Sequence, residues 1–207
     1  GMAVSVDICN LALGDIRAPA IADIAEDTVE ASMCARYYPH CLAVLLDDYS
    51  WQFTKRIASL ALLTTNERES EWAYAYALPS DCGQALRLVP NQGQVIADTY
   101  YRDQLDLPPP AWWAKFIVED GVLYCNLSDA VLEYASDAAD EADFPPLFRE
   151  ALRKLLAANL AVPIRDSREL EGDLLKMAER ARQSAIAADM NRAPRNEMTD
   201  DIAWARR

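Results

Sequence analysis

Apolar residues recur at helical spacing near both ends of the chain. In the clearest case, a stripe from Val29 to Leu45 repeats every four residues through Met33, Tyr37 and Cys41. Such spacing places the apolar side chains on one face of a helix. The same reasoning predicts four helices, which cover approximately residues 4–16, 27–48, 145–161 and 166–190.

Capping residues and prolines set the expected ends of these helices. Asp27 with Glu30 three residues later is a typical capping-box start for the second helix. Pro39 lies within that helix and predicts a kink, because proline removes one backbone hydrogen bond. Pro163 is expected to end the third helix.

The middle of the chain, about 51–136, has a different pattern, with short apolar runs separated by Pro, Gly, Asn and Asp. These runs predict strands at 72–78, 85–89, 115–119, 122–126 and 131–135. Asp120 and Gly121 stand between two of them and predict a two-residue hairpin turn. The fold class is therefore expected to be α+β.

The expected architecture is a helical body built from both chain ends, with the central β-rich segment projecting from it as an extension. We expect one domain over 2–195 and a C-terminal arm over 196–207.

The fourth helix suggests a candidate interface with a partner. Its body-facing residues are expected to be Leu170, Leu174 and Met177. The other end is rich in alanine, which permits close approach of a second helix, and its candidate interface residues are Ala181, Ala185 and Ala188. The partner is either a neighbouring subunit or the third helix of the same chain, and the sequence leaves both open.

The arm supplies three more candidate interface residues, Trp204, Arg206 and Arg207. Thr199 and the acidic residues after it predict a short helix, which the two arginines complement at its other end. The tail over 191–207, which includes the arm, is net positive on an acidic protein, so the acidic surface that it docks on can belong to its own subunit, to a neighbour or to another partner. Our hypothesis is an arm that is anchored by Trp204, mobile in the free monomer and ordered by a partner.

Charge limits the classes of partner. The formal net charge is −13, whereas a protein that grips duplex DNA needs clustered Lys and Arg. Electrostatic repulsion between the acidic protein and DNA would suit a conduit through which DNA slides. The chain has no apolar run near the roughly 18 residues of a membrane span and no recognisable export signal, so we expect a soluble protein made in the cytoplasm.

No motif marks an active site. His40 is the only histidine, and no nucleophile elbow, Walker A loop or dinucleotide-binding glycine motif accompanies it. Cys34 and Cys41 near His40 suggest a metal site, but about two helical turns, roughly 10 Å, would separate the two thiols. We therefore expect reduced, buried cysteines and predict no catalytic residue, no metal site, no cofactor and no enzyme activity.

Three blocks of sequence resemble one known family. The first block is Ile8–Gly14 with Pro19 and Asp27-Thr28. The second is Ala35–Pro39 with Leu45-Leu46, Trp51–Phe53 and Lys55-Arg56. The third is Phe144–Phe148 with Ala151-Leu152, Leu155–Ala158 and Leu160-Ala161. In this order they resemble the tail tubular protein A family, the head-to-tail adaptors of short-tailed bacteriophages and prophages.

The resemblance implies a structural protein of the virion, made in the bacterial cytoplasm. Family members form a ring, dodecameric in well-studied cases, between the portal protein and the tail nozzle protein, and DNA passes through it without specific binding. The family has no catalytic residues, and no membrane is involved. Two other interpretations stay open: a small-molecule or peptide binding module built on the central strands, and a hydrolase that uses carboxylates.

Overall fold

The structure, a computed structural model, describes residues 3–89 and 115–192. The α+β fold class is confirmed.

The chain divides into a helical unit, Gly1–Phe53 with Asp140–Arg207, and a β unit, Thr54–Ala139. Helices from both chain ends share one unit, as predicted. The central segment has a core of its own, so two compact units stand where the sequence predicted one domain over 2–195. The expected arm over 196–207 lies outside the described residues.

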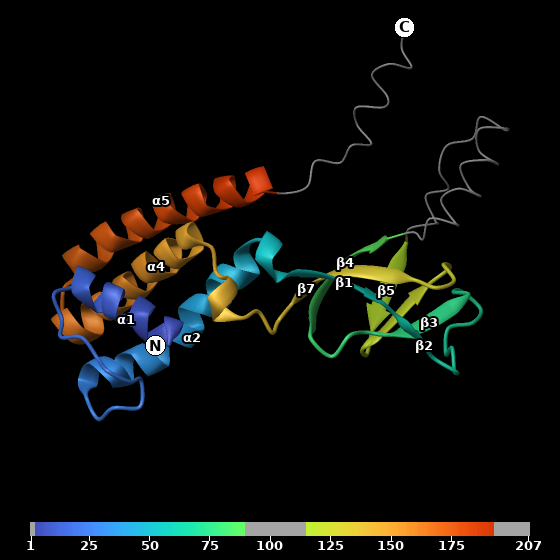
Figure 1. Ribbon diagram of the computed structural model, residues 1–207, viewed down its shortest axis with the longest axis horizontal. Helices are drawn as coiled ribbons and strands as arrows, with labels where there is room; N and C mark the ends of the chain where they lie inside the picture. The colour runs from blue at the N-terminus through green and yellow to red at the C-terminus, as the bar shows by residue number, and fades with distance from the viewer. Residues whose placement is uncertain (1–2, 90–114, 193–207) are drawn as a thin grey trace, which may run out of the picture. The chain divides into compact units, whose positions relative to one another are not determined.

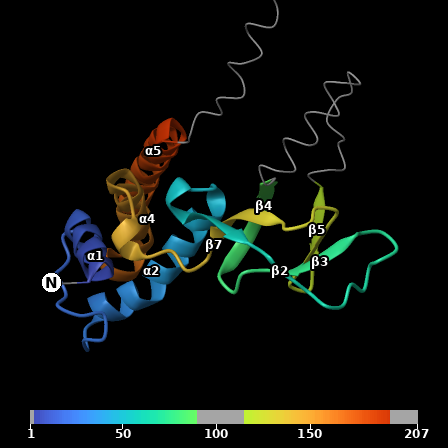
Figure 2. The ribbon, with the colours of Figure 1, turned by 45° about the vertical axis from the view of Figure 1, so that its right-hand side comes forward.

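In its described residues the helical unit has four helices and two short 3-10 turns, the first of which ends one residue beyond the unit's boundary. They are α1 (Val4–Asp15), α2 (Val29–Asp48), η1 (Gln52–Thr54), η2 (Glu141–Asp143), α4 (Pro146–Arg165) and α5 (Arg168–Arg192). Helices α4 and α5 run side by side as an antiparallel hairpin (Figures 1 and 2). The other two helices pack against α4, which is therefore the central helix of the unit.

Two helix ends differ from the prediction. Thr28, not Asp27, caps α2, because its hydroxyl accepts a hydrogen bond from the Ala31 N–H at 3.2 Å. Pro163 does not end α4, which continues to Arg165. A proline in the last turn removes only one backbone donor, and the helix ends instead at Asp166, whose φ of 48° is left-handed.

Aromatic rings form the centre of the helical core. Trp51 is 1% exposed, and its ring meets those of Phe148 and Tyr49 edge to face at centroid distances of 4.9 and 5.0 Å. Phe53 and Phe144 pack beside Phe148. These residues come from segments nearly 100 positions apart in the sequence, so the cluster joins the two ends of the chain.

An ion pair fixes α1 on α4. Arg153 donates two hydrogen bonds to the Asp15 carboxylate, at 2.9 and 2.6 Å, and the Lys154 Nζ lies 3.3 Å from it. A carboxylate in the last turn of a helix opposes the helix dipole, and two cations offset that cost. Bidentate geometry makes this one of the stronger kinds of ion pair, and the hydrogen bond with Asp15 raises the pKa of Arg153.

The described residues of the β unit form two antiparallel sheets. Its strands are β1 (Lys55–Ser59), β2 (Ala61–Leu62), β3 (Tyr74–Ala77), β4 (Cys82–Val89), β5 (Phe116–Glu119), β6 (Val122–Cys125) and β7 (Val131–Ser136). One sheet has the order β1-β7-β4 and the other β2-β3-β6-β5. All five predicted strands are present, whereas β1 and β2 were not predicted. The hairpin between β5 and β6 is confirmed, with φ of 50° at Asp120 and 76° at Gly121.

Polar contacts at one end of the β1-β7-β4 sheet converge on Asp81. Its carboxylate accepts hydrogen bonds from the hydroxyls of Tyr134 and Ser136, each at 2.9 Å, and from the Arg56 guanidinium at 2.7 Å. The Ser136 hydrogen bond, followed by that of Tyr134, lowers the pKa of Asp81. Leu123 and Leu132 are fully buried in the core of the β unit.

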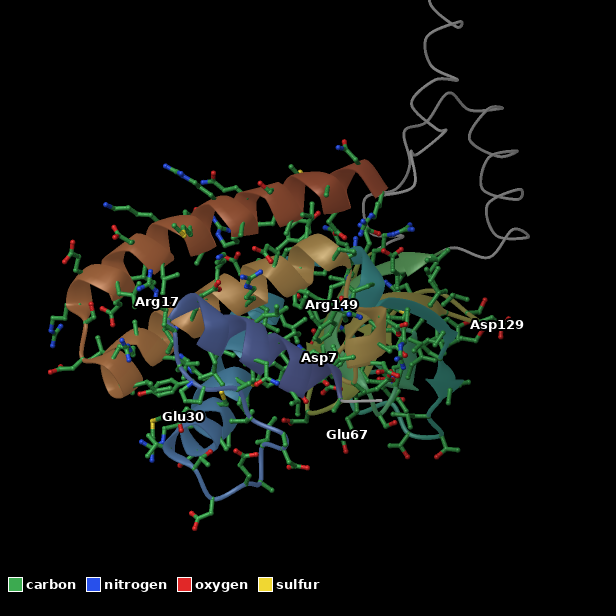
Figure 3. The ribbon with its side chains drawn as sticks, turned by 60° about the vertical axis from the view of Figure 1, so that its left-hand side comes forward. Asp7, Arg17, Glu30, Glu67, Asp129 and Arg149 are labelled. Atoms are coloured by element: carbon green, nitrogen blue, oxygen red, sulfur yellow. The ribbon has the colours of Figure 1, made fainter. Side chains whose placement is uncertain are left out.

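Charged side chains lie on the outside of both units. Asp7, Arg17, Glu67 and Asp129 are all exposed (Figure 3). Within the described ranges, Asp189 is the one charged residue that is buried. None of the helices in residues 3–89 and 115–192 is long and apolar enough to cross a membrane.

We expect Phe148→Ala to destabilise the helical unit by about 3–5 kcal/mol, because it leaves a cavity against Trp51. Its neighbour on α4, Leu147, is exposed, so Leu147→Ala should change the free energy of unfolding by about 0.5 kcal/mol. Urea unfolding followed by circular dichroism at the helical band would measure both. Equal losses in the two variants would contradict the assignment of Phe148 to the core.

Candidate functional site

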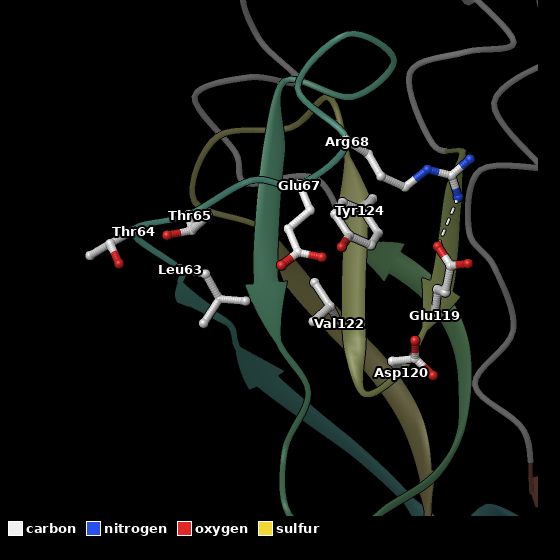
Figure 4. A pocket seen from close by; sticks show the side chains of 9 residues that line it. All are labelled: Leu63, Thr64, Thr65, Glu67, Arg68, Glu119, Asp120, Val122 and Tyr124. Carbon is white, nitrogen blue, oxygen red and sulfur yellow. Dashed lines mark hydrogen bonds and ion pairs between the residues drawn. The ribbon is translucent and has the colours of Figure 1, made fainter.

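A wide cleft lies in the β unit (Figure 4). It encloses about 820 Å³ and is open to solvent. Its lining residues are Leu63, Thr64, Thr65, Glu67, Arg68, Glu119, Asp120, Val122 and Tyr124. They come from the loop between β2 and β3 and from the β5-β6 hairpin, and most of them are polar.

Arg68 holds the loop against the hairpin. Its guanidinium donates to Glu119 at 3.1 Å and to Glu71 at 2.9 Å, and its central carbon lies 5.9 Å from the centre of the Tyr124 ring. The hydrogen bond with Glu71 is the main cause that raises the pKa of Arg68. Asn66 orders the same loop, since its side chain donates to the Trp72 carbonyl and accepts from the Arg68 N–H.

These contacts limit what the cleft can bind. Both charges that Arg68 meets are carboxylates from its own unit, so its cation is already neutralised. The remaining charged groups of the lining, Glu67 and Asp120, are acidic and exposed. Small-molecule sites are concave and mostly apolar, with a few convergent polar groups. This cleft differs from them because its lining is mostly polar and it is open to solvent.

The cysteines and the histidine that suggest a metal site in the sequence do not converge. Cys34 and Cys41 are buried on α2, whereas His40 is exposed on the same helix. Within residues 3–89 and 115–192 no group of three or more His, Cys, Asp or Glu side chains is arranged to hold a metal ion.

Three buried cysteines, Cys9, Cys34 and Cys41, share the helical core. Cys9 shares a side-chain hydrogen bond with Cys34, and this bond, followed by burial, raises the pKa of the Cys9 thiol. Burial also raises the pKa of Cys41 to about 12. Tyr38 lies in the same core; burial, and its 2.8 Å hydrogen bond to Glu141, raise its pKa as well.

The structure corrects the expected interface on α5. Ala185 is only 3% exposed and belongs to the core of its own unit, and Ala181 packs against the same core. Ala188 is half-buried. The alternative, that this end of α5 packs within its own chain, is therefore the one that the structure supports, and the assignment of Ala185 to a surface for a partner is wrong.

The body-facing residues of α5 were predicted in part. Leu174 is buried and Leu170 packs against the core, as expected. Met177, in contrast, is 48% exposed, so its assignment to the body is wrong. The other three candidate interface residues, Trp204, Arg206 and Arg207, lie outside the described residues.

Sequence reasoning missed Asp189, a buried carboxylate near the end of α5. Its Oδ2 accepts a hydrogen bond from the Gln52 N–H at 3.0 Å. Burial, with the charge of Asp189 as a further cause, raises the pKa of Tyr49 nearby. Asp189 thus connects α5 to the segment that follows α2. Its position four residues after Ala185 is the signal that could have placed it on the inner face.

Comparison with protein-family models and with curated proteins finds no match for this chain. The interpretation of its function therefore depends on the residue patterns and on the geometry described above.

We expect Ala185→Glu to destabilise the isolated protein by about 3–5 kcal/mol, because it places an unpaired charge in the helical core. Ala187, two residues away on α5, is exposed, and Ala187→Glu should cost only about 0.5 kcal/mol. Thermal and urea unfolding of the two variants would provide the comparison. A stable Ala185→Glu protein would show that this face of α5 is not internal.

The five thiols should differ in reactivity. Cys82 is the one cysteine that is not fully buried, so iodoacetamide at pH 8 should modify it first. Cys41, with a pKa of about 12, should be roughly 10⁻⁴ ionised at that pH and should react only after unfolding. Mass spectrometry of labelled peptides would resolve the sites, with Cys82→Ser as the control. Rapid labelling of Cys41 in the folded protein would contradict its burial.

Proposed function

We propose that the protein is a phage or prophage head-to-tail connector, which forms a ring between the portal protein and the tail nozzle protein. The observation that carries this proposal is that the three sequence blocks of the resemblance meet in one core. A shared core is what a common fold of the three blocks requires.

Each block contributes large buried side chains to that core. The first block provides Ile8 and Leu13, the second provides Trp51, and the third provides Phe148 and Leu152. Thus the residues that carry the resemblance are mainly those that determine the packing of the helical unit. The agreement supports a common fold for the body of a connector.

The charge and surface of the protein suit a structural role. A net charge of −13 disfavours tight contacts with nucleic acid, and DNA that passes through an acidic ring would move without specific binding. Such a protein would be made in the bacterial cytoplasm and would act in the virion, as a homo-oligomer in contact with portal and nozzle.

A binding module built on the β unit is the second interpretation. Its cleft is polar and open, and the one cation of the lining is neutralised internally. These features give little support for recognition of a small molecule or an anion, and we favour the connector.

The proposal predicts assembly that depends on the portal. The isolated protein should be monomeric or weakly associated in dilute, low-salt buffer, because its subunits repel one another. High salt should promote self-association, since the Debye length falls to about 3 Å at 1 M. Adding the portal protein encoded in the same phage or prophage genome should produce a ring seated on the portal. Mass photometry and negative-stain images would measure these states.

A portal from an unrelated phage provides the control and should not recruit the protein. Absence of any complex with the cognate portal would reject the connector. A stable dodecamer of the protein alone in dilute, low-salt buffer would contradict the dependence on the portal.

A further inference from the structure

A narrow apolar groove lies on the helical unit, where α2 and α4 meet α5. It encloses about 120 Å³, and its lining residues are Leu45, Ala151, Leu155, Leu175, Ala178, Glu179 and Arg182. Leu175 stands at the groove and is 46% exposed. The groove offers room for one large apolar side chain, and filling it would remove the exposed face of Leu175 from water.

The polar rim of the groove carries excess negative charge. Arg182 donates to Glu179 at 2.8 and 2.9 Å and to Asp48 at 2.7 Å. Two carboxylates surround one guanidinium, and all three side chains are partly exposed. The groove therefore fits an occupant that combines a large apolar anchor with nearby positive charge.

The chain itself contains a segment of this character. Trp204 is the one aromatic residue in 193–207, and Arg206 and Arg207 follow it closely. Fourteen residues of α5 separate Ala178 from Arg192, which is about 21 Å of helix. The 12 residues from Arg192 to Trp204 span up to about 40 Å when extended, so the segment is long enough to return to the groove of its own subunit.

We propose that residues 193–207 dock on the groove of their own subunit, with Trp204 as the anchor and Arg206 and Arg207 beside the Glu179–Asp48 rim. A short tether gives an effective concentration in the millimolar range, which favours the segment of the same chain over a second copy in dilute solution. This proposal replaces the expectation of an arm that only a partner orders. It does not depend on the connector function.

Fluorine NMR of the full chain, labelled with 5-fluorotryptophan, tests this docking. The chain has five tryptophans, and Trp204→Phe assigns the resonance of Trp204. A labelled peptide of residues 193–207 gives the position of the undocked side chain. At low micromolar concentration, the Trp204 resonance of the full chain should be displaced from the peptide position, and Leu175→Glu should return it there.

Met177→Glu is the matched control. Met177 lies on the same helix and is 48% exposed, close to the exposure of Leu175, but it does not line the groove. This variant should leave the Trp204 resonance displaced. The resonance of the buried Trp51 reports whether each variant is folded, and Leu175→Ser takes the place of Leu175→Glu if that resonance changes.

Three results would overturn the proposal. The first is a Trp204 resonance at the peptide position in the unmodified chain. The second is an equal response to the Leu175 and Met177 variants. The third is a displaced resonance that returns to the peptide position on dilution, which would assign the segment to the groove of a second copy. Portal binding is measured separately, so each of these results leaves the connector proposal to its own test.

Discussion

The helical unit depends on the burial of one indole ring. Trp51 follows α2, and its Nε1–H donates to the Leu45 carbonyl at 2.8 Å. Leu45 is in the last turn of α2, where carbonyls have no partner within the helix, so one hydrogen bond satisfies both the indole donor and a free helix end. Because the same ring packs against Phe148, it sets the position of α4 against the end of α2. The helices at the two ends of the chain become one body through this contact.

The fold class could be predicted because its signals are local. The Asp120-Gly121 turn requires positive φ at both residues, and the two residue types allow it. Strand β1, in contrast, pairs with β7 so that Lys55 lies opposite Ala135. All five side chains of β1 are exposed or only half-buried, so the strand has no alternation of buried and exposed positions that its own sequence could indicate. The segment becomes a strand because it pairs with β7, some 80 residues away, and the local sequence pattern does not reveal that pairing.

The candidate site was predicted less well, because the sequence did not show correctly which face of α5 is turned toward the core. The predicted stripe contains Leu174, Ala178 and Ala185, which are buried, but it also contains Met177, which is exposed, and it omits Asp189, which is buried. Because core-facing positions are predicted from apolar residues, such a prediction cannot assign a carboxylate such as Asp189 to the inner face. Asp189 is tolerated inside because a backbone N–H from the segment after α2 satisfies one of its oxygens, and a contact of that kind is visible only in three dimensions.

Small residues indicate that another helix approaches closely, but they do not identify which one. The helix that packs on the alanine-rich face of α5 is α4, because a link of two residues, Asp166 and Ser167, joins the two helices as a hairpin. A neighbouring subunit competes for the same face only at its free concentration, whereas α4 is always present at a high effective concentration. The alanine-rich face is therefore used within the chain. What α5 can offer to other segments is the exposed apolar side chain of Leu175, which lines the groove beside α4.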